Sequence, residues 1–134
     1  MEDGFFIAGL GYYRNSHTKR KGSMRKLNDI IKYAGHVTAI TESLRGRRGA
    51  TKYVTKALAS SITLIKEAQS AYAKDTENAS KHLNLVLNEF HKLEYCLDSL
   101  YSISFIDEKE YKRVCEEGAK LRSSLTSSIR EANS

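Results

Sequence analysis

The sequence predicts an all-α fold, an antiparallel up-down four-helix bundle with a short irregular N-terminal segment. Its 134 residues include no proline, and apolar residues recur at alternating steps of three and four in four separate stretches. Because an α-helix has about 3.6 residues per turn, such spacing places the apolar side chains on one face of each helix. Four helices that are each apolar on one side bury those sides against one another, which favours a single bundle.

The N-terminal segment, residues 1–23, is expected to form a basic, glycine-rich extension outside the bundle of residues 24–134. Its glycines at positions 4, 9, 11 and 22 argue against a helix. The run Gly22-Ser23-Met24 has the form of a cloning scar followed by a start methionine. This pattern leaves open that part of the extension is foreign to the natural protein.

The first two helices are predicted over Met24–Leu44 and Ala50–Tyr72. Ser23 is a candidate N-cap for the first helix, because its hydroxyl can accept a hydrogen bond from a first-turn amide. The connector over residues 45–49 contains two glycines, which allow the chain to reverse. The residues of the second helix that are expected to face inward are Val54, Leu58, Ser61, Ile62, Ile65, Ala68 and Tyr72.

The third helix is predicted to follow a turn at residues 75–78, and the fourth is predicted to begin after Asp107. The fourth has the clearest start, because Asp107 and Glu110 form an Asp version of the capping box, and Ile106 and Tyr111 can close a hydrophobic staple. The third helix ends near Tyr101. It carries the most regular apolar stripe, which comprises Ala79, Leu83, Val86, Phe90, Leu93, Leu97 and Leu100.

Composition narrows the class of protein. A hydrophobic content of 40% with 28% charged residues is typical of a folded domain. The longest apolar stretch, residues 4–13, is about half the length that a membrane span needs. It also follows acidic residues, unlike a secretory signal, so a cytoplasmic protein is expected. Cys96 and Cys115 have no CxxC spacing and are expected to be reduced thiols.

The sequence carries no pattern that predicts catalysis, a metal site or a cofactor. A di-iron bundle needs Glu-x-x-His motifs, and the chain has none. It also lacks the Gly-x-Ser-x-Gly turn of hydrolases and the phosphate-binding loop of nucleotide hydrolases. The four histidines are expected to be hydrogen-bonded or to face solvent. We therefore expect a protein that is not an enzyme.

The distribution of charge gives the one positive functional signal. Residues 1–49 hold ten Lys or Arg against four acidic residues, whereas residues 50–134 hold twelve of each sign. This asymmetry predicts a basic surface directed at a polyanion such as RNA. The alternative is an ordinary solvated basic surface. The candidate nucleic-acid-binding residues are Arg45, Arg47 and Arg48 of the connector, Lys52 and Lys56 one turn apart after it, Arg25 and Lys26, and Lys19, Arg20 and Lys21.

Aromatic residues and off-stripe apolar residues extend this interpretation. Tyr53, beside Lys52, and Tyr33 are candidates for stacking on bases, although each is equally suited to packing. No motif for recognising a DNA or RNA sequence is present, so binding is expected to follow charge and shape. Five apolar residues off the main stripes predict either self-association or a broad core-facing stripe: Leu64, Leu85, Leu87, Tyr95 and Tyr101.

The order of several short helix patterns resembles a bacterial four-helix-bundle family. The residues that carry this resemblance are Ser60 with Ile65-Lys66-Glu67-Ala68, the run Leu93-Glu94-Tyr95-Cys96-Leu97-Asp98-Ser99-Leu100, and Phe105-Ile106-Asp107-Glu108-Lys109-Glu110-Tyr111. The family comprises proteins encoded in intervening sequences of 23S ribosomal RNA genes and the accessory variability determinant proteins of diversity-generating retroelements. The chain has Ile62, Leu64 and Ala68 where the intervening-sequence branch has Pro, Asn and Gly, which favours the retroelement branch.

The resemblance implies a non-catalytic accessory protein of a diversity-generating retroelement. It implies a homopentamer that binds RNA, and also DNA, and assists a partner reverse transcriptase. Two alternatives stay open: a 23S ribosomal RNA intervening-sequence protein, whose role is unknown, and a protein-interaction bundle that binds no nucleic acid directly.

Overall fold

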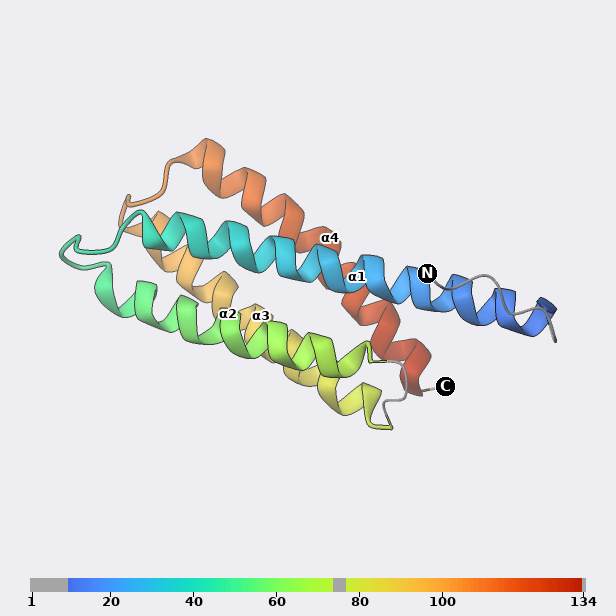
Figure 1. Ribbon diagram of the computed structural model, residues 1–134. Coiled ribbons are helices and arrows are strands. Elements are labelled where there is room, and N and C mark those ends of the chain that lie inside the picture. The colour runs from blue at the N-terminus through green and yellow to red at the C-terminus, as the bar shows by residue number, and fades with distance from the viewer. Residues whose placement is uncertain (1–9, 74–76, 134) are drawn as a thin grey trace.

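A computed structural model describes the backbone of residues 10–73 and 77–133, and the side chains of residues 22–73 and 77–133. Four helices account for most of these residues: α1 (Leu10–Glu42), α2 (Thr51–Ala71), α3 (Ala79–Ser102) and α4 (Glu108–Asn133). Successive helices run in opposite directions, and the α1–α2 and α3–α4 loops lie at the same end of the bundle (Figure 1). The predicted all-α, up-down four-helix bundle is confirmed.

The start of α1 differs from the prediction. The helix begins at Leu10 and continues without a break to Glu42, so the expectation of irregular structure is wrong for residues 10–23. Residues 1–9 lie outside the described chain. Gly11 and Gly22 each cost about 1 kcal/mol relative to alanine, whereas each residue added to an existing helix gains a hydrogen bond. The first part of α1 thereby extends past the ends of the other helices (Figure 1).

The core is built from the stripes of all four helices. Tyr33 of α1 and Phe90 of α3 are fully buried, with ring centroids 4.9 Å apart. A Cβ added at Gly118 of α4 would lie 3.3 Å from both rings. The absence of a side chain at Gly118 therefore lets α4 approach this aromatic pair. The stripe predicted for α3 is confirmed from Leu83 onward.

The buried face of α2 is rotated relative to the prediction. Leu58 and Ile62, expected to face inward, are 37% and 61% exposed, and Leu64, expected off the stripe, is fully buried. The residues that α2 buries are mostly small: Val54, Ala57, Ser60, Ser61, Leu64, Ala68 and Ala71. Small side chains allow helices to pack closely, and the α2–α3 pair has the most extensive contact of the helix pairs. The close approach of α2 to α3 therefore outweighs the burial of Leu58 and Ile62.

The predicted start of α4 is confirmed. The backbone N–H of Glu110 donates to Asp107 Oδ1 at 2.8 Å, and Ile106 is 4% exposed. Both cysteines are free, as expected, with Cys96 buried and Cys115 half-buried. In the part of the chain that the structure describes, no helix is long and apolar enough to cross a membrane.

Candidate nucleic-acid interface

The α1–α2 loop is anchored by two buried residues and turns at two glycines. Leu44 and Ala50 are buried at its ends. Gly46 and Gly49 have φ values of +87° and +92°, a backbone region that residues with a Cβ rarely adopt. The anchored ends and the two turns hold the intervening arginines on the surface, where Arg45, Arg47 and Arg48 are all exposed.

Two of these arginines contact neighbouring groups. The Arg45 guanidinium donates to both carboxylate oxygens of Glu42, at 2.8 and 2.5 Å, and this pairing lowers the pKa of the Glu42 carboxyl. The Arg47 guanidinium lies over the Phe105 ring, 4.6 Å from its centroid. Phe105 belongs to the α3–α4 loop. The cation–π contact therefore joins the two loops at this end of the bundle.

Two lysines on the first turns of α2 lie over tyrosine rings. Lys52 Nζ is 5.0 Å from the centroid of Tyr53, and Lys56 Nζ is 4.8 Å from that of Tyr95 on α3. The two tyrosine rings are 6.4 Å apart at their centroids. Tyr95 is 53% exposed. Two neighbouring tyrosine rings, each with a lysine ammonium over it, therefore lie where α2 meets α3.

We call Arg45, Arg47, Arg48, Lys52 and Lys56 the basic tip. Within residues 22–73 and 77–133, no carboxylate forms an ion pair with any of them except Arg45. The first turn of α2 contains no acidic residue, and no side chain caps it. The positive end of the helix dipole adds potential next to the cations. The basic tip is thus a concentration of positive charge with little internal neutralisation.

The remaining candidate residues lie elsewhere. Arg25 is exposed near the opposite end of the bundle, about 30 Å along α1 from the loop, given a rise of about 1.5 Å per residue. Lys26 donates to Ser128 at 3.1 Å and lies 3.8 Å from Glu131. These two residues therefore do not join the basic tip. The side chains of Lys19, Arg20 and Lys21 lie outside the described residues, although their backbone belongs to α1.

Sequence reasoning identified some aromatic residues of this surface and missed others. Tyr33 is 1% exposed and cannot stack on a base, so that candidate is wrong. Tyr53 is half-buried and remains a candidate. Tyr95 and Phe105 approach the cations only because α2 and α3 pair and the two loops meet. The one available signal was the position of Tyr95 off the apolar stripe of its helix.

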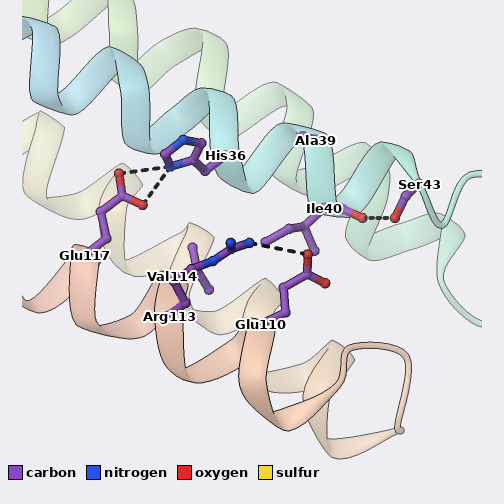
Figure 2. A pocket seen from close by; sticks show the side chains of 8 residues that line it. All are labelled: His36, Ala39, Ile40, Ser43, Glu110, Arg113, Val114 and Glu117. Carbon is purple, nitrogen blue, oxygen red and sulfur yellow. Dashed lines mark hydrogen bonds and ion pairs between the residues drawn. The ribbon is translucent and has the colours of Figure 1, made fainter.

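A separate groove of about 470 Å³ lies between α1 and α4. Figure 2 shows His36 on one wall facing Glu117 on the other, and the His36 Nδ1 donates to both oxygens of that carboxylate at 2.8 and 3.0 Å. Arg113 and Glu110 form a second pair in the groove, at 3.8 Å. Since its charges are paired within the groove, this region attracts a polyanion less than the basic tip does.

Groups suited to metal or thiolate chemistry do not gather at either place. Among the residues described, no cluster of three or more His, Cys, Asp or Glu side chains is arranged to hold a metal ion. The described histidines 36, 82 and 91 each bond a single glutamate. Burial raises the pKa of the Cys96 and Cys115 thiols, which disfavours the reactive thiolate.

Comparisons with protein-family models, with curated proteins and with solved structures return no match for this chain.

Proposed function

We propose that the chain is a non-catalytic scaffold that binds RNA, and also DNA, through the basic tip. The observation that carries this proposal is the group of four cations, Arg47, Arg48, Lys52 and Lys56, with which no described carboxylate forms an ion pair. All but Arg48 lie over an aromatic ring, and the Tyr95 ring is exposed. Guanidinium groups bind phosphates through paired hydrogen bonds, and ammonium groups bind them as point charges. Each contact releases a counterion from the nucleic acid.

The biological setting of the proposal rests on the family resemblance. An accessory protein of a diversity-generating retroelement would hold RNA for a partner reverse transcriptase in the cytoplasm. In a ring of five copies, each basic tip would be repeated, and simultaneous contacts would raise the overall affinity well above that of one tip. The intervening-sequence branch of the same family is the alternative setting.

A second function, binding to a protein partner, is favoured by one observation. Leu58 and Ile62 lie one turn apart on the outer face of α2 and are 37% and 61% exposed. An apolar pair of this kind is typical of a protein contact when neighbouring residues extend it. Capture of partners from a lysate treated with nuclease distinguishes the two functions, because partners held only through RNA are lost.

The test of RNA binding compares two triple variants with equal changes in charge. Arg45, Arg47 and Arg48 are replaced by alanine in one, and Lys66, Lys81 and Lys120 in the other; the latter three are exposed and lie away from the basic tip. Affinity for a labelled RNA is measured across a salt series. The arginine variant should lower the slope of log affinity against log salt by about 0.7–0.9 for each phosphate that it no longer binds. Equal slopes for both variants would contradict the proposal.

A further inference from the structure

We infer that the basic tip binds unpaired nucleotides, with one base seated against Tyr53 and the next against Tyr95, and that it discriminates against duplex RNA. This inference rests on the proposed function and specifies its substrate. It starts from a hollow of about 530 Å³ beside the tip, lined by Gly49, Thr51, Lys52, Tyr53 and Ile103. Pockets for small organic molecules span roughly 300–1,000 Å³, so the hollow has room for one nucleobase.

The lining of the hollow suits a flat aromatic ligand that carries a negative charge at its edge. Ile103 is 45% exposed and gives one side an apolar surface, while Tyr53 gives another side an aromatic one. Gly49 lines the hollow with its backbone alone. The Lys52 ammonium lies over the Tyr53 ring, 5.0 Å from its centroid, so a base that stacks on this face takes the place of the ammonium, and the flexible lysine side chain can move to the phosphate of that base.

A second aromatic position follows the first across the α2–α3 surface. The centroid of the Tyr95 ring is 6.4 Å from that of Tyr53, and the ring planes are inclined by 57°. The inclination means that the two rings do not stack on each other, so each can present a face to a different base. Lys56, over the Tyr95 ring at 4.8 Å, repeats the pairing of cation and ring. Each of two successive nucleotides can therefore meet one tyrosine ring and one lysine ammonium.

Duplex RNA cannot use these features. In a duplex the base faces are stacked on each other, and only the backbone and the groove edges are accessible to a protein. A duplex would bind the basic tip through phosphates alone. A single strand would add stacking, which is worth about five- to 150-fold in affinity per base when an aromatic side chain is removed.

The experiment measures the affinity of the full chain for a 12-nucleotide uridine RNA and for a 12-base-pair RNA duplex at the same salt concentration. The wild type should bind the single strand at least tenfold more tightly. Tyr95→Leu and Tyr53→Leu should each weaken single-strand binding about five- to tenfold and leave duplex binding unchanged. Tyr53→Phe keeps the ring and should retain the wild-type affinity.

The matched control is Tyr101→Leu, because Tyr101 stacks on Tyr111 at 4.0 Å on the other side of α3. It should leave both affinities unchanged. Equal affinity for the two RNAs, with no effect of the tyrosine variants, would overturn the single-strand inference and leave the basic tip as a phosphate-binding surface. Binding of neither RNA at low salt would instead overturn the proposed function itself. Displacement of the single strand by a glutamate 12-mer as readily as by unlabelled RNA would overturn the inference in favour of an acidic protein partner.

Discussion

The two loops at one end of the bundle use opposite chemistry to begin a helix. The α3–α4 loop ends in Asp107, whose carboxylate accepts the Glu110 N–H, and α4 has acidic residues in its first turn. The α1–α2 loop ends in Ala50, which offers no side-chain cap, and α2 has Lys52 in its first turn. The first arrangement stabilises a helix N-terminus through the chain's own negative charge. The second has neither a side-chain cap nor an acidic residue in the first turn.

The pairing of charges differs in the same way. Lys112 pairs with Glu108 at 3.1 Å beside the α3–α4 loop. Beside the α1–α2 loop, Arg45 alone has a carboxylate partner among the described residues. Under the proposed function, the cations of the α1–α2 loop should set affinity and the Asp107 cap of the α3–α4 loop should set stability, so variants of those two features should have different effects.

The largest expected effect comes from Lys52→Glu. It gives α2 the acidic first turn that α4 has, so the free energy of unfolding should stay the same or rise by about 0.3–1 kcal/mol. RNA affinity should fall on the order of tenfold, because a phosphate contact is replaced by repulsion. Urea unfolding and fluorescence anisotropy measure the two quantities. If Lys52→Glu lowered both the free energy of unfolding and the RNA affinity, the proposed division of roles between the two loops would be contradicted.

The next effect concerns the turn of the α1–α2 loop. Gly46 has a φ of +87°, and a Cβ at this position would meet no other atom within 4 Å, so Gly46→Ala should cost about 1–2 kcal/mol through backbone strain alone. Ser104 adopts a φ of +66° in the α3–α4 loop. Ser104→Gly should therefore change stability little, because relief of strain opposes a more flexible unfolded chain. Thermal unfolding of both variants checks the contrast, and an equal loss in the two would refute it.

Asp107→Ala should lower the free energy of unfolding by about 1 kcal/mol, because the Glu110 N–H loses its acceptor. Asp107→Asn keeps an acceptor and serves as the control. RNA affinity should not change in either variant, since Asp107 belongs neither to the basic tip nor to the lining of the hollow beside it. If Asp107→Ala clearly lowered RNA affinity under conditions where the variant is fully folded, the binding surface would include the α3–α4 loop at Asp107, against this account.

The smallest effect is expected from Glu42→Gln. Removing this carboxylate frees the Arg45 guanidinium, and RNA affinity at low salt should rise about twofold. Glu110→Gln changes the net charge by the same amount beside the other loop and should have no effect. If both variants raised affinity equally, the protein would respond to net charge and not to the position of Arg45.

The fold followed from the sequence because its signals are local. The stripe of Leu83, Val86 and Phe90 and the capping pair Asp107–Glu110 depend on spacing within one helix. The buried face of α2 did not follow, because the choice between Leu58 and Leu64 depends on how closely α3 approaches. The spacing of apolar residues alone predicts as buried those that complete a regular stripe, which in α2 are Leu58 and Ile62.

The candidate site was predicted only in part for the same reason. Its cations cluster in the sequence, so Arg45, Arg47 and Arg48 could be identified from one connector. Its aromatic partners come from positions far along the chain, and pairing of α2 with α3 is what brings Tyr95 to Lys56. Likewise Glu117 lies 81 residues from His36, beyond any pattern within a helix.

Lysine footprinting tests the central claim most directly, because it reports position and does not require a variant. Acetylation of each lysine is measured by mass spectrometry with and without the 12-nucleotide uridine RNA. We predict that Lys52 and Lys56 become protected, whereas Lys109 and Lys112 beside the α3–α4 loop react as before. Protection of Lys109 and Lys112 with full reactivity at Lys52 and Lys56 would contradict the account.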